Sequence, residues 1–267
     1  MKVIGKERAM SLVFRSVSLS DIGLVRNGNE DSGLVSPTLL AVADGMGGHA
    51  AGEVASKIAV TTLKELAQVL EDPAIDNDSR QDILLSVSHE IDDAILREGN
   101  ENPEFSGMGT TLTALHINNN SVELLHIGDS RCYHFAGGEL KQLSYDHTVM
   151  QELIDQGRLT PEEVHSHPQR SVLTQVLMGD SGIDPVLMVY PVKRGDFFLL
   201  CSDGLSSVLS DGEIEKIIKT NQGPALVDAL LFATKAAGAP DNVTIIWAEV
   251  VDGSDDSVSY LLGAANE

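Results

Sequence analysis

The stretch TTLTALHINNNSVELLHIGDSRCYHF, residues 110–135, decides the fold. β-Branched, aromatic and leucine residues dominate three short runs in it, which predicts strands over 110–117, 121–127 and 131–135. Asn118–Asn120 supplies the first turn. Connections this short imply antiparallel pairing, because parallel strands need a crossover of about a dozen residues or more. We therefore predict antiparallel sheet in the middle of the chain.

Outside this stretch the sequence changes between strand and helix patterns. Further strands are predicted over 12–19, 39–43, 185–191, 196–202 and 243–251, with a hairpin turn at Gly137–Gly138. Apolar residues at helical spacing predict two helices after Gly52, with faces formed by Ala59, Leu63, Leu66 and Leu70 and by Leu84, Val87, Ile91 and Ile95. Other helical segments are predicted over 146–164 with a break from Gly157 to Pro161, over 171–178, from a capping box at Ser210–Glu213, and over 224–237.

This order of elements predicts an α+β fold. Two packed, mostly antiparallel β-sheets, flanked by helices on their outer faces, would form a four-layer α-β-β-α sandwich. No linker, internal repeat or low-complexity block divides the chain, so residues 1–251 are expected to form a single domain. Residues 252–267 are acidic and rich in small residues, and we expect them to form a flexible tail.

Composition narrows the possible functions. The formal charge is −22, and such an acidic chain is a poor partner for nucleic acid, whose binding depends on neutralising phosphates. No apolar run approaches the roughly 18 residues of a membrane span, and the first ten residues do not resemble a secretory signal. Two cysteines, Cys132 and Cys201, cannot make a disulfide framework. A cytoplasmic protein without a membrane segment is the expectation, and no exposed apolar stripe demands more than a monomer.

Aspartates follow several of the predicted strands. One Asp-Gly pair is ordinarily a turn. Four aspartates at strand ends, usually beside glycine, are harder to explain in that way, because clustered carboxylates repel one another unless a cation joins them. The segments are 41–45 (AVADG), 126–129 (HIGD), 200–204 (LCSDG) and 240–243 (PDNV).

Carboxylates without a His or Cys cluster favour hard cations, Mg²⁺ or Mn²⁺ rather than Zn²⁺. Two such ions about 3.5–4 Å apart produce a hydroxide near neutral pH, a chemistry suited to the hydrolysis of phosphate esters. A guanidinium that grips the phosphate is then expected, and Arg26 in 23–31 (GLVRNGNED) is the best candidate. The alternative interpretation makes Arg26 an ordinary salt-bridge partner of Glu30 or Asp31.

Six short motifs occur in an order and at spacings that resemble the type 2C metal-dependent protein serine/threonine phosphatases, in particular their bacterial branch. The resemblance covers about residues 12–251. Each motif is weak alone, and the set of six is specific. The motifs are 23–31 (GLVRNGNED), 44–48 (DGMGG), 109–111 (GTT), 128–131 (GDSR), 202–204 (SDG) and 241–244 (DNVT).

The resemblance implies a role for each matching residue. It implies that Asp44 bridges two central metal ions, that the Gly45 carbonyl completes one site, and that Asp203 and Asp241 hold the other ion. Arg26 matches the phosphate-binding arginine. Glu30 and Asp31 match acidic residues that support metal-bound waters. Asp129, Asp203 and Ser171 match residues that reach a third, weaker metal site. Asp129 as a simple turn residue and Ser171 as a helix cap are the competing interpretations.

One position departs from the pattern. Several eukaryotic relatives carry His after the Asp-Gly pair, where it can protonate the leaving group, and here that position is Met46. His49 is the nearest histidine, and a surface or capping role is the simpler interpretation for it.

The resemblance implies hydrolysis of phosphoserine and phosphothreonine on proteins by a hydroxide that bridges two metal ions, in opposition to a cognate serine/threonine kinase. Two other hypotheses remain open. One is a phosphatase restricted to a single regulatory partner protein. The other is a catalytically inactive relative that serves as a phosphoprotein-binding module, although no metal ligand is missing.

Overall fold

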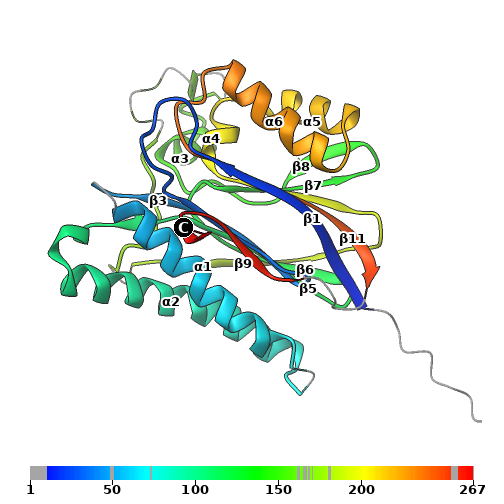
Figure 1. Ribbon diagram of the computed structural model, residues 1–267, viewed down its shortest axis with the longest axis horizontal. Helices are drawn as coiled ribbons and strands as arrows, with labels where there is room; N and C mark the ends of the chain where they lie inside the picture. Colours follow the sequence, from blue (N-terminus) through cyan, green and yellow to red (C-terminus); the bar gives the residue numbers. More distant parts are fainter. Residues whose placement is uncertain are drawn as a thin grey trace, which may run out of the picture.

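The computed structural model describes residues 11–48, 51–72, 74–160, 163–164, 167, 169, 171–179, 182–253 and 258–266. Two antiparallel sheets pack face to face, with helices on both outer faces (Figure 1). This arrangement confirms the predicted α+β sandwich. Among the described residues, no helix combines the length and apolar character needed to cross a bilayer.

The strands form one sheet of five and one of seven. In spatial order, the first sheet contains β1 (Ser11–Asp21), β11 (Val243–Gly253), β10 (Phe197–Cys201), β7 (Arg131–Ala136) and β8 (Glu139–Gln142). The second contains β12 (Tyr260–Gly263), β2 (Asp31–Val35), β3 (Leu39–Met46), β5 (Leu112–Asn118), β6 (Ser121–Ile127) and β9 (Val186–Pro191), with the short β4 (Gly109–Thr110) paired to β3.

Helices cover the outer face of each sheet (Figure 1). Helices α1 (Ala51–Leu70) and α2 (Asn77–Glu101) pack on the seven-stranded sheet, and a 3-10 turn at Pro103–Phe105 follows them. On the five-stranded sheet lie α5 (Asp211–Thr220) and α6 (Pro224–Ala236). The short α3 (Val149–Asp155) and α4 (Asp203–Ser206) lie near one end of the sandwich, and a 3-10 turn at Ala264–Asn266 ends the described chain.

Alternation along the strands produces three apolar layers. In β3, Leu40 and Val42 point between the sheets, whereas Leu39 and Ala41 point toward α1 and α2. Trp247 of β11 belongs to the third layer, between the five-stranded sheet and α5 and α6. Because β3 is buried on both faces, its sequence is a continuous apolar run that ends at Asp44.

No strand was predicted over β2, β12 or β8, although the hairpin turn expected at Gly137–Gly138 does lead into β8. β2 has the sequence DSGLV, whose first three residues have low strand propensity, yet all five residues are buried between β3 and β12. β12 lies in the segment expected to be a flexible tail, and that expectation is wrong for residues 260–266. Leu261 and Leu262 of β12 pack on two of the apolar layers, and β12 pairs with β2 in register. Residues 254–257 lie outside the described part of the chain.

Two helical predictions also need correction. Among the described residues of the segment 146–164, the expected α-helix is found at Val149–Asp155, where Thr148 caps its start and Gly157, at φ 65°, turns the backbone away at its end, and residues 163–164 have 3-10 conformation. The segment 171–178, expected to be a helical turn, is irregular instead. Leu173 forms an isolated bridge with Thr148, just before α3, and Leu177 forms one with Thr110 of β4, so this segment makes its hydrogen bonds to other parts of the chain.

We predict that ending the chain at Gly253 destabilises the fold. Loss of two half-buried leucines and an edge strand should cost about 3 kcal/mol and lower the melting temperature by about 6–12 °C, as measured by calorimetry. Val258→Ala, at a side chain that is 81% exposed, is the control and should shift the melting temperature by less than about 2 °C. Equal stability of the truncated and full chains would contradict a structural role for β12.

Candidate metal centre

Asp44 and Asp31 lie side by side at the ends of β3 and β2, where they form a register pair. The Asp44 N–H donates to the Thr111 hydroxyl (3.0 Å), and the Asp44 carbonyl accepts from the Thr111 N–H (2.9 Å) and the Thr110 hydroxyl (3.0 Å). Asp31 is 1% exposed and accepts a hydrogen bond from the Ser202 hydroxyl at 2.7 Å. The backbone around both carboxylates is therefore fixed.

Close backbone contact explains the glycine after Asp44. A Cβ on Gly45 would lie 2.0 Å from the carbonyl oxygen of Gly52 in α1 and 2.6 Å from that of Glu30. Any other residue would push α1 away from β3. The Glu30 carboxylate accepts a hydrogen bond from the backbone of Gly52 and lies 3.8 Å from Arg26.

Asp129 lies in the three-residue connection between β6 and β7. Although this connection is short, it passes from the seven-stranded sheet to the five-stranded one. Gly128 makes the crossing possible, since its φ is +103° and a Cβ there would lie 2.6 Å from Thr111. The Gly128 N–H donates to His147 Nδ1 at 3.1 Å, which holds the connection against the segment before α3.

Asp203 and Asp241 come from the five-stranded sheet. Asp203 follows β10 as the first residue of α4, and Asp241 lies two residues before β11. The two segments touch at Gly204, where a Cβ would lie only 1.8 Å from the Asn242 carbonyl oxygen. Asp203 also shares a hydrogen bond with Asp44, so the two sheets meet at these carboxylates.

Asn242 fixes the loop that carries Arg26. Its side chain accepts from the Glu30 N–H (2.8 Å) and donates to the carbonyls of Ile22 (3.0 Å) and Gly28 (2.9 Å). Arg26 Nη2 donates to Asp241 at 2.7 Å, and its side chain remains 48% exposed. Arg26 thus pairs with Glu30, one of the two partners named in the salt-bridge interpretation, and with Asp241, which that interpretation did not name.

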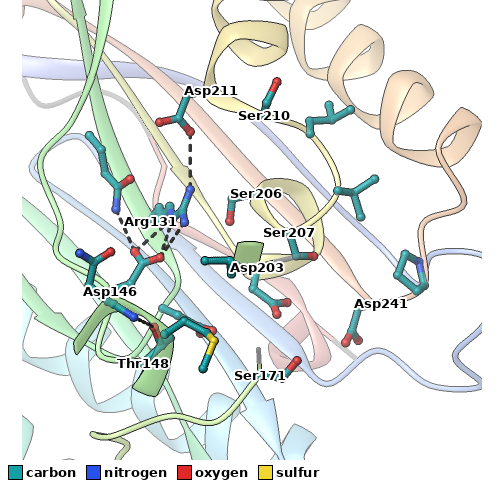
Figure 2. A pocket seen from close by; sticks show the side chains of 18 of the residues that line it. Arg131, Asp146, Thr148, Ser171, Asp203, Ser206, Ser207, Ser210, Asp211 and Asp241 are labelled. Carbon is teal, nitrogen blue, oxygen red and sulfur yellow. Dashed lines mark hydrogen bonds and ion pairs between the residues drawn. The ribbon is translucent and has the colours of Figure 1, made fainter. Parts of the chain in front are cut away.

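A cavity of about 1080 Å³ opens beside these residues (Figure 2). Arg26, Asp129, Asp203, Asp241 and Ser171 all line it. Asp44 contacts the lining residue Asp203, and Gly45 and Glu30 lie against Gly52 of α1. Ser171 is exposed and lies at a turn, and not at the start of a helix as the capping interpretation expects. His49 lies outside the described residues.

Burial and mutual repulsion raise the pKa of the clustered carboxylates. Burial raises the pKa of Asp129 to about 8, with a contribution from Asp203. Burial also raises the pKa of Asp31 to about 7 and that of Asp203 to about 6. The pKa of Asp44 is raised well above its ordinary value by burial and by Asp31. This cluster is therefore costly to ionise without a cation.

The donor set fits hard divalent ions. It consists of carboxylate oxygens, with no Cys or His among the described residues that line the cavity, and Mg²⁺ and Mn²⁺ prefer such ligands. In the part of the chain that the structure describes, no three Asp, Glu, His or Cys side chains already converge as a finished site. Asp241 pairs with Arg26, and Asp31 accepts a hydrogen bond from Ser202.

Sequence reasoning gave no role to several residues that position the site. Ser202 links Asp31 to β11, because its hydroxyl also accepts from the Thr244 N–H at 2.9 Å. Asn242 and Thr111 likewise fix other segments of the site through hydrogen bonds. Ser202, Asn242 and Thr111 all lie inside the short motifs, so the sequence shows their positions but not the residues that they contact. Arg131, bound to Asp146 by three contacts of 2.7–3.1 Å beside Asp129, was equally unassigned.

The fold and the carboxylate cluster define a class of metal-binding phosphatase domains, and comparison with known proteins agrees. The family model for protein phosphatase 2C matches residues 31–230. This chain belongs to the protein phosphatase 2C family, which confirms the resemblance inferred from the motifs.

Individual relatives are bacterial serine/threonine phosphatases. PstP of Mycobacterium tuberculosis is 44% identical over 96% of this chain, which spans about half (49%) of that protein's length. PhpP of Streptococcus pneumoniae is 35% identical over 85% of this chain and 94% of its own. The crystal structure of the PstP catalytic domain with two manganese ions superposes with a TM-score of 0.82 and 41% identity, covering 91% of this chain and 100% of that one.

We predict that the metal-free protein is more stable near pH 5.5 than near pH 8.5. The raised pKa values of Asp129, Asp31 and Asp203 mean that the folded state binds protons that the unfolded chain lacks in this range. The stabilisation is present at low pH and is lost as pH rises through about 6 to 8. The melting temperature with EDTA should fall by about 5–10 °C across the range.

Two substitutions distinguish the effect of the carboxylate cluster on this pH dependence from the effect of the net charge of the chain. Asp129→Asn should reduce this difference in melting temperature, because it removes one of the repelling charges. Asp228→Asn, on the exposed face of α6, removes the same formal charge and should leave the difference nearly unchanged. Identical effects of both variants would show that net charge alone is responsible.

Proposed function

We propose that this chain hydrolyses phosphoserine and phosphothreonine in proteins, using two Mn²⁺ or Mg²⁺ ions, and so opposes serine/threonine kinases. The observation that carries the proposal is the cluster of buried and half-buried, mutually repelling carboxylates from both sheets that adjoins a cavity lined by Arg26. Family membership and the serine/threonine phosphatases among the relatives support the reaction class. The two manganese ions in the PstP structure support the cofactor.

Asp44, Asp203 and Asp241, with the Gly45 carbonyl, would hold the two ions, and Asp129 and Ser171 would reach a weaker third one. The ions, when bound, supply an activated water and offset charge on the phosphate oxygens. Glu30 and Asp31 would orient water around them. Asp31 is suited to this role because its carboxylate is fixed by Ser202 and is shielded from bulk solvent.

Arg26 would bind the phosphate group of the substrate. Its guanidinium lies at the cavity and is held near Asp241 and Glu30, so it is already directed toward the carboxylate cluster. A doubly charged phosphate is a stronger partner than one carboxylate, and a guanidinium can grip it with two parallel hydrogen bonds. Met46 cannot donate a proton to the leaving group, so that proton must come from solvent or another side chain.

The first test is phosphate release from a phosphothreonine peptide with Mn²⁺. Release should stop with EDTA and should fall by more than about 100-fold in Asp203→Asn, since even outer-shell partners of a metal contribute about 10–100-fold. Asp228→Asn, on the exposed face of α6 and away from the cavity, is the matched control. Metal binding by calorimetry without any release would instead support an inactive phosphoprotein-binding module, and release from only one partner protein would support the narrow phosphatase.

Arg26→Ala should lower kcat/KM for phosphopeptides by about 10–100-fold, which corresponds to the loss of hydrogen bonds to a charged group. Arg26→Lys should restore only part of the loss, because an ammonium cannot bind two oxygens in parallel. Arg15→Ala on β1, at a residue that does not line the cavity, is the control. A kcat/KM for Arg26→Ala within about twofold of wild type would contradict phosphate binding by this residue.

A further inference from the structure

The cavity beside the carboxylates is larger than a phosphorylated side chain requires. Its volume of about 1080 Å³ is at the upper end of ligand sites, which range over about 300–1,000 Å³. From Asp203 and Asp241 the lining continues along the 206–212 loop to the start of α5 and across to α3 (Figure 2). There is therefore room for the residues on either side of a phosphoserine or phosphothreonine.

Two elements give this extension an apolar surface. Met150 and Ile154, spaced four residues apart, lie on one face of α3 and line the cavity. Val208 and Leu209 line it from the 206–212 loop. Met150 and Leu209 are buried, whereas Ile154 and Val208 are half-buried and remain partly open to a ligand.

The charged residues that line the extension disfavour acidic side chains of a substrate. Among the described residues that line the cavity, the Lys and Arg residues are Arg26 and Arg131. Arg131 is already bound to Asp146 at 2.7 Å and to the Tyr133 hydroxyl at 3.0 Å, and it lies 3.5 Å from Asp211. The Asp211 side chain is 56% exposed, so an incoming carboxylate would meet a like charge and, among the described lining residues of the extension, no available cation.

From these observations we infer that the chain selects phosphorylated segments with an apolar side chain next to the phosphorylated residue, contacted by Ile154 and Val208, and discriminates against an acidic one. This inference rests on the proposed function, because it describes the substrate of the same site. An apolar contact of this size changes kcat/KM between competing substrates by about 10–200-fold. Because this surface is partly open to solvent, we expect a preference near the lower limit of that range.

The test uses three phosphothreonine peptides that differ only in carrying Leu, Gln or Glu on both sides of the phosphorylated residue. With Mn²⁺, kcat/KM should follow the order Leu, Gln, Glu, with the Leu peptide about 10-fold above the Gln peptide. Ile154→Thr and Val208→Thr should each reduce this ratio to less than about 3-fold. Val208→Thr is nearly isosteric and avoids a change of volume.

Val189→Thr is the matched control, because Val189 is 48% exposed on the edge strand β9 and does not line the cavity. It should keep the wild-type ratio. Turnover of p-nitrophenyl phosphate is measured in every variant to verify that the phosphate-binding end is intact.

Equal kcat/KM for the Leu and Gln peptides, with metal-dependent release intact, would overturn the inference and leave the proposed function standing. A wild-type ratio in both Ile154→Thr and Val208→Thr would overturn the assignment to these residues. Absence of metal-dependent release from all three peptides and from p-nitrophenyl phosphate would overturn the proposed function and, with it, this inference.

Discussion

Repulsion among clustered carboxylates is the constraint on which the rest of this structure depends. The pKa of each of four carboxylates, Asp31, Asp44, Asp129 and Asp203, is raised in part by a neighbouring carboxylate, and burial strengthens the effect because little water screens the charges. A chain that folds into this arrangement must hold the carboxylates in place by other contacts. Those contacts are made by the backbone and by short polar side chains of both sheets.

The supporting contacts cross between segments that are far apart in the sequence. Ser202 connects β10 to Asp31 of β2, and Asn242 connects the region before β11 to the loop that carries Arg26. Gly45 and Gly204 allow backbone segments to approach to distances that no Cβ would tolerate. The motifs therefore contain both the proposed ligands and the residues that bring the sheets together around them.

The same end of the sandwich carries the surface beyond the carboxylates. Helix α3 and the loop after α4 extend the cavity, and the Arg131–Asp146 pair joins the base of α3 to β7 beside Asp129. The proposed phosphate centre and the proposed peptide contacts thus share one structural support. This arrangement explains how a small set of strand ends could combine a general reaction with selection among phosphorylated segments.

The sequence by itself determined the two antiparallel sheets, most of the strands and both long helices, because their apolar periodicity is strong and local. It also indicated the aspartates, since each follows an apolar strand. It did not reveal β2, whose first three residues have low strand propensity, or β12, which is only four residues long; β12 pairs with β2, and β2 pairs with β3. Nor could it show that Gly128–Ser130 passes from one sheet to the other. That crossing, and the contacts of Ser202 and Asn242, depend on which segments meet in space, and only the tertiary structure decides this.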